Sequence, residues 1–215
     1  TVQNGNEYCY EITAIYGENE GNPSSPICVI PEAQTIYEIY YDDGEIETSV
    51  NAGEGNYLCV KFTPNSYPVD LYRVSFYCDD APTGVGFVNV WDDDGENGMP
   101  GTVLVENVPT TFAGDSWTPI PMSAYGVTID DGSFYVGWWE LADTPPVGVD
   151  SDNSSENSFI DIGFGDGLQS FGDIFEGAIM IRAEVDSASA TSVDIGKESY
   201  MQPLSFNLEQ NYPNP

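Results

Sequence analysis

The chain contains no histidine among its 215 residues. Histidine is the usual general base near neutral pH and a frequent metal ligand. Its absence excludes Ser-His and Cys-His nucleophile pairs, and it removes the usual protein ligand of zinc and iron. Two carboxylates alone can cleave a glycosidic bond, but no pair of acidic residues stands out. We therefore predict that the chain is not an enzyme and has no catalytic residues.

Basic side chains are almost as scarce, because 4 Lys and Arg stand against 36 Asp and Glu, for a formal net charge of −32. A polyanion repels phosphate backbones and anionic lipids, so binding to nucleic acid or to a membrane surface is disfavoured. The sequence shows no membrane-spanning run and no N-terminal signal sequence, so we expect no direct membrane insertion. Two roles remain for the acidic residues of this protein, a solvated surface suited to salty surroundings or the binding of divalent cations.

Long helical periodicity is also missing, whereas 22 Gly and 15 Pro interrupt the chain and 40% of it is hydrophobic. This composition favours a turn-rich all-β fold with a packed core. We predict a two-sheet, jelly-roll-like β-sandwich over residues 34–187, preceded by a hairpin in residues 1–33. The strands 57–62, 71–78 and 86–91 should form its centre. Residues 125–129 and 133–139 are expected to form a hairpin, and 143–157 a long loop.

Cysteine occurs four times, as Cys9, Cys28, Cys59 and Cys78. The first two and the last two are each 19 positions apart and each join neighbouring strand-like segments. Neither pair has the CxxC spacing of a zinc site. We predict two local disulfides, formed in an oxidising compartment. Strand alternation places Cys59 and Cys78 on faces of different composition, so a bulge or a strand end must reconcile them if they pair. Four buried free thiols are the alternative.

An acidic loop follows the strand 86–91 and is the best candidate metal site. Its oxygen-bearing side chains are Asp92, Asp93, Asp94, Glu96 and Asn97. Ca²⁺ takes about six to eight oxygen ligands, and glycines permit the tight turn that gathers them. A cation would also relieve the repulsion between adjacent carboxylates. We predict calcium binding here, with a solvated acidic turn as the alternative.

A second candidate calcium cluster lies in the expected loop 143–157. Its members are Asp150, Asp152, Asn153 and Glu156. The same ligand chemistry supports it, and a polar loop without a metal is the alternative.

Tryptophans provide a different kind of candidate site, because glycan-binding jelly rolls often stack exposed aromatic rings on sugars. Trp91, Trp138 and Trp139 are the candidates. Adjacent residues of a strand point to opposite faces, so one of Trp138 and Trp139 should point away from the core. Burial of these aromatic strands in the core is the alternative. An exposed Trp91 or Trp139 would favour glycan binding.

Residues 1–33 resemble the last two strands of a fibronectin type III domain. The resemblance rests on the run Tyr10-Glu11-Ile12-Thr13-Ala14, the turn 17–26 and the closing strand 27–30. A lone hairpin is marginal in water. We expect it to pack on the next domain, to be a remnant of a larger one, or to self-associate by pairing with another chain.

Two further resemblances concern the rest of the chain. The runs 41–44, 93–101, 117–118 and 134–138 are together similar to a β-sandwich module of secreted multidomain bacterial proteins, often placed behind a peptidase. After a linker that begins at residue 188, the run 206–215 (Phe-Asn-Leu-Glu-Gln-Asn-Tyr-Pro-Asn-Pro) resembles the opening of a type IX secretion C-terminal sorting domain. This resemblance implies contact with the secretion machinery and export to the outer cell surface or the medium.

These features predict a non-catalytic, calcium-stabilised β-sandwich module of an exported protein, with a structural, adhesive or spacer role. A carbohydrate-binding accessory module of a secreted hydrolase is one alternative. A subunit of an extracellular filament or assembly, joined by strand pairing, is the other.

Overall fold

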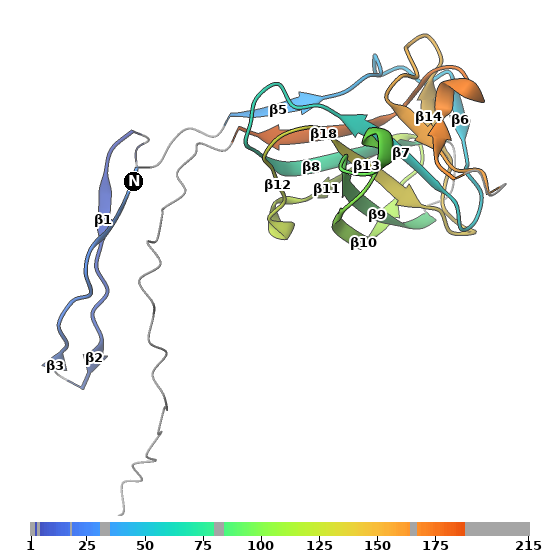
Figure 1. Cartoon of the computed structure of the whole chain (residues 1–215). Coiled ribbons are helices and arrows are strands. Elements are labelled where there is room, and N and C mark those ends of the chain that lie inside the picture. Colours follow the sequence, from blue (N-terminus) through green and yellow to red (C-terminus); the bar gives the residue numbers. More distant parts are fainter. Residues whose placement is uncertain are drawn as a thin grey trace, which may run out of the picture. The chain divides into compact units, whose positions relative to one another are not determined.

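The computed structural model describes residues 3, 5–17, 19–30, 35–79, 84–163 and 167–187 (Figure 1). The described residues fall into two compact units, one before residue 31 and one from 35 to 187. Within these ranges, no helix has the length and apolar character needed to cross a membrane. The expected linker and sorting signal in 188–215 lie outside the described residues, and the proposed domain boundaries stay predictions.

The first unit is built on a short antiparallel ladder. Strand β1 (Tyr8–Tyr10) pairs with β4 (Ile27–Val29), and Cys9 lies directly opposite Cys28. A disulfide joins these two residues, which confirms the first of the two predicted bridges. At the far end of the hairpin, β2 (Ile15–Tyr16) pairs with β3 (Asn19–Glu20). Self-association through this hairpin stays a prediction.

The second unit is a sandwich of two antiparallel sheets, which confirms the predicted fold class. The six-stranded sheet has the order β10 (Val103–Phe112), β9 (Gly84–Asp92), β13 (Phe134–Trp139), β7 (Tyr57–Phe62), β15 (Ser158–Ile160) and β16 (Gln169–Ser170). The eight-stranded sheet has the path β17 (Ala178–Ile179), β14 (Val147–Asp150), β8 (Val69–Cys78), β18 (Ile181–Asp186) and β5 (Ile36–Ile39). Off that path, β11 (Ser116–Pro121) and β12 (Thr128–Ile129) pair with β8, and β6 (Thr48–Val50) pairs with β14.

The three strands expected at the centre are central, although they belong to different sheets. Strands β7 and β9 flank β13 in the six-stranded sheet, and β8 lies inside the eight-stranded sheet. Their inward side chains meet in one apolar core. There the Trp138 ring stacks on Phe76, with centroids 5.2 Å apart, and meets Phe112 edge-on at 4.7 Å.

Two local predictions are wrong. Strand β12 pairs with β8, whereas β13 pairs with β7 and β9, so the turn between them crosses from one sheet to the other instead of closing a hairpin. The glycine turn only reverses the direction of the chain. Ile129 is buried in the core that the two sheets share, and a strand of either sheet can place it there. The expected loop 143–157 contains β14, whose four residues are buried.

The second predicted disulfide is also wrong, because Cys59 and Cys78 are both free, buried thiols. Cys59 lies on β7, and its neighbours Leu58 and Val60 occupy the core, so strand alternation turns Cys59 to the outer face. Cys78 lies on β8 of the other sheet and faces the core. Burial raises the pKa of both thiols, that of Cys78 to about 12.

Candidate functional site

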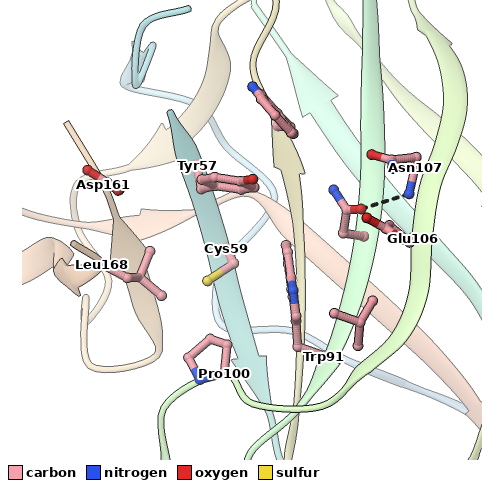
Figure 2. A pocket seen from close by; sticks show the side chains of 11 residues that line it. Tyr57, Cys59, Trp91, Pro100, Glu106, Asn107, Asp161 and Leu168 are labelled. Carbon is pink, nitrogen blue, oxygen red and sulfur yellow. Dashed lines mark hydrogen bonds between the residues drawn. The ribbon is translucent and has the colours of Figure 1, made fainter. Parts of the chain in front are cut away.

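A groove of about 270 Å³ lies on the outer face of the six-stranded sheet (Figure 2). Its floor is low because Gly137 lies opposite Cys59 on one neighbouring strand and Asn89 on the other. A Cβ atom at Gly137 would lie 2.2 Å from the backbone oxygen of Leu58, so no other residue fits there. The close approach of β13 and β7 therefore requires glycine at position 137. Because glycine has no side chain, the middle of this face stays hollow.

Aromatic rings from three strands border the hollow. The Tyr57 ring lies 5.3 Å from the Trp139 ring and 6.2 Å from the Trp91 ring, centroid to centroid. Trp139 is 39% exposed, whereas its neighbour Trp138 is fully buried. In Figure 2, Trp91 stands between Cys59 and Glu106. Two of the three candidate tryptophans thus border the groove, and the third belongs to the core.

Polar groups complete the rim. Glu106 and Asn107 are exposed residues of β10, and the backbone N–H of Asn107 donates to Asn89 Oδ1 at 2.7 Å, the dashed line of Figure 2. On the opposite side, Asp161 follows β15, and its backbone N–H donates to the backbone carbonyl oxygen of Tyr57 at 2.8 Å. Burial, and then the negative charges of Glu106 and Asp161, raise the pKa of Tyr57. The rim is therefore electronegative.

Sequence reasoning missed these rim residues. A shift of register within β10 and the left-handed backbone of Asn107 (φ 56°) direct this part of the strand toward the groove. The signal was present in the sequence, because Glu106 and Asn107 interrupt the apolar alternation between Val105 and Val108. Nothing local marks Asp161, which reaches the groove through the pairing of β15 with β7.

The acidic loop lies at one end of the groove, but its side chains bind separate partners. Asp93 forms an ion pair with Lys61 (Nζ to Oδ2, 3.3 Å). Asp94 accepts hydrogen bonds from the Thr102 hydroxyl at 2.7 Å and the Thr102 backbone N–H at 2.6 Å, which lower the pKa of Asp94. The other side chains proposed as ligands are those of Asp92, Glu96 and Asn97.

The sheet holds this loop in place through one carbonyl oxygen. Lys61 Nζ donates to the Gly98 oxygen at 3.1 Å, and the Tyr135 hydroxyl donates to the same atom at 2.6 Å. Among the residues that the structure describes, no three Asp, Glu or Cys side chains are gathered as a metal site. Calcium binding by the loop stays a prediction.

The second calcium candidate is organised around one buried carboxylate. Asp150 is fully buried and accepts hydrogen bonds from the backbone N–H of Asp43 (2.6 Å), Asn153 Nδ2 (2.6 Å) and the backbone N–H of Asp152 (3.0 Å). Burial alone would raise the pKa of Asp150, but these hydrogen bonds outweigh it and lower the pKa. Asp152 and Glu156 are exposed. Asp150 thus joins two loops, and calcium binding here also stays a prediction.

Near Trp117, on the other sheet, the Tyr77 ring meets the Trp117 ring edge-on at 5.6 Å, and a cation lies against Trp117. The Arg182 guanidinium lies 4.4 Å from the Trp117 ring centroid and 4.9 Å from that of Tyr40. The same guanidinium pairs with the buried Asp42 carboxylate at 2.5 Å. Trp117 therefore already has a cation as its stacking partner.

Part of this chain is similar to part of a known bacterial protein. No family model matches the chain, so the resemblances to fibronectin type III and sorting domains have no such support, and no solved structure matches. The chain is 30% identical over 163 residues to Bacillopeptidase F of Bacillus subtilis (strain 168). The matched region is 71% of this chain but 11% of that protein, so the chain spans only a small part of its relative.

Proposed function

We propose that this chain is a non-catalytic accessory module of an exported protein, and that it binds a glycan in the groove of the six-stranded sheet. The observation that carries the proposal is the aromatic group formed by Tyr57, Trp91 and Trp139 on an outer sheet face. Ligand sites combine apolar and aromatic walls with a few polar groups that fix orientation. A sugar ring needs both, because its faces are apolar and its edge carries hydroxyls.

The rim offers the hydrogen-bonding groups for such hydroxyls. Within the described ranges, the exposed Glu106 carboxylate makes no hydrogen bond or ion pair with another side chain. Asp161 lies across the groove and has one of its carboxylate oxygens bonded to the Gly163 N–H at 2.8 Å. These carboxylates can therefore accept hydrogen bonds from hydroxyls on either side of a stacked ring.

Two observations support an accessory role outside the cytoplasm. The similar segment is a small part of a protein named as a peptidase, which is consistent with a module attached to a catalytic region. The Cys9–Cys28 disulfide is typical of oxidising compartments. Surface attachment, adhesion and type IX export belong to the same proposal and rest on the sequence resemblances alone.

The test is glycan binding by the whole chain and by tryptophan variants. A panel of soluble polysaccharides would be screened by affinity electrophoresis, and the strongest ligand measured by calorimetry. Trp139→Ala and Trp91→Ala should each weaken binding about tenfold, equivalent to about 1.4 kcal/mol. Tyr125→Ala is the matched control, because Tyr125 is an exposed aromatic residue in the turn η2 (Ser123–Tyr125) and does not line the groove. Failure of every polysaccharide to bind, or unchanged binding by both tryptophan variants, would refute the proposal.

A further inference from the structure

The groove is the middle one of three adjoining hollows on this sheet face, which together we call the trough. A second hollow, of about 490 Å³, lies beyond the end of β13 and shares Asn107 and Trp139 with the groove. A third, of about 520 Å³, lies beside the acidic loop and shares Pro100 and Leu168 with the groove. Each end hollow therefore adjoins the middle one.

The three hollows lie one after another along the strands, and an exposed carboxylate borders each of the outer two. Glu140 lines one end hollow, and Tyr135 contacts the loop at the other end through Gly98. The five residue steps along the chain from Tyr135 to Glu140 correspond to about 17 Å at the rise of an antiparallel strand. Glu54 and Glu96, at opposite ends, are exposed. A chain several sugar rings long can therefore enter at one end and leave at the other.

The end hollow next to β13 has a fixed wall. The buried Glu140 carboxylate accepts a hydrogen bond from the Gly53 N–H at 2.7 Å and another from the Asn51 side-chain amide. Burial is the main cause that raises the pKa of Glu140. The backbone N–H of Gly55 also donates to the backbone carbonyl oxygen of Glu140 at 2.9 Å. The loop that borders this hollow is thus held in place before any ligand arrives, which lowers the entropic cost of binding.

Charge restricts what the trough can hold. Carboxylates border each of its three parts. Glu54 lies at the hollow beyond β13, Glu106 and Asp161 at the middle groove, and Glu96 at the hollow beside the acidic loop. The nearby cation, Lys61, is already bound to Asp93 and to the Gly98 oxygen. These carboxylates would repel an anionic polymer bound in the trough. Salt would screen the repulsion only partly, because the screening length at physiological salt is about 8 Å.

We propose, as an extension of the glycan-binding function and resting on it, that the ligand is a linear polysaccharide without carboxylate or sulfate groups. It binds through an internal segment that occupies all three hollows. The middle hollow supplies ring stacking on Trp91 and Trp139, and the end hollows add contacts that only longer chains can reach.

The experiment compares chain lengths and charges with the intact protein. Linear oligosaccharides of the neutral polysaccharide selected by the panel, from disaccharide to octasaccharide, would be titrated by calorimetry. The expected result is an affinity that rises about tenfold or more between the shortest and longest members. In parallel, β-1,4-mannan and β-1,4-mannuronate oligosaccharides of equal length would be compared, since they share a backbone and differ in the C6 carboxylate. Mannuronate should bind more weakly at low salt, and added NaCl should narrow the difference.

Two variants locate the end hollows. Phe87→Ala, in the hollow beyond β13, and Met99→Ala, beside the acidic loop, should weaken the binding of long oligosaccharides but leave that of short ones unchanged. A disaccharide that binds as tightly as an octasaccharide, or a mannuronate that binds as tightly as the mannan at low salt, would overturn this inference. If Trp139→Ala still weakened that binding about tenfold, the glycan function itself would stand. Absence of binding by every glycan would instead overturn both.

Discussion

Asp150 is the buried carboxylate that joins two loops of the eight-stranded sheet, and Asp150→Asn should cost about 4 kcal/mol of stability. One carboxylate oxygen accepts from Asp43 and Asn153, and the other accepts from Asp152. Asparagine keeps one acceptor oxygen, so one bond is lost and two become neutral. Hydrogen bonds to a charged group contribute about 1.5–3 kcal/mol and neutral ones about 1 kcal/mol. The loss corresponds to about 10 °C in melting temperature for a domain of this size.

Urea unfolding at neutral pH, with a chelator present, measures this loss. Asp152→Asn is the matched control, because Asp152 is exposed and only its backbone N–H binds Asp150. A loss below about 1 kcal/mol for Asp150→Asn, or an equal loss for the control, would refute the reasoning. If chelated wild type were as weak as Asp150→Asn and CaCl₂ rescued the wild type alone, the carboxylate would act through a metal.

The pH dependence of the same difference follows from the lowered pKa of Asp150. A carboxyl whose pKa is lower in the folded state stabilises the protein above its unfolded pKa of about 3.9. That contribution is lost as the pH falls through the folded pKa. The stability gap between wild type and Asp150→Asn should therefore be full at neutral pH and shrink below about pH 4. A gap that stays constant into this acid range would contradict the hydrogen-bond account.

Three further predictions concern the metal, the thiols and the core. Millimolar CaCl₂ should raise the melting temperature of chelator-treated protein by several degrees, whereas MgCl₂ and NaCl should not. The double variant Asp92→Ala, Asp94→Ala should abolish this rise. Equal effects of all three salts would instead indicate simple charge screening. A thiol reagent should add two labels to unfolded, unreduced protein, at Cys59 and Cys78, and none to folded protein; labelling of four cysteines would exclude the disulfide. Trp138→Ala should cost about 3–5 kcal/mol in urea unfolding, because its ring is fully buried between aromatic neighbours; a cost under about 1 kcal/mol would be inconsistent with that burial.

Much of the fold was predictable because strand formation and facing are local properties. In β18, Ile181, Ala183 and Val185 face the core while Arg182 and Glu184 do not, as their alternation indicates. The same rule required one of Trp138 and Trp139 to leave the core.

Strand partners were harder to predict, because pairing depends on segments far apart in the chain. Cys59 and Cys78 lie on adjacent strands in sequence, yet those strands belong to opposite sheets. Likewise, the turn after β12 looks like a hairpin turn, but it connects two sheets. A turn specifies a change of chain direction within a few residues, whereas the choice of partner is made by burial across the whole core.

An all-β chain, its strongly acidic character, a local disulfide and a tryptophan outside the core all follow from the residues and their local order. The polar residues beside that tryptophan are set by how distant segments pack together. Glu106, Asp161 and Trp139 come from three separate segments and meet because the sheet order is β10, β9, β13, β7 and β15. That order is not the order of the chain, so no local pattern shows that these three residues line one groove.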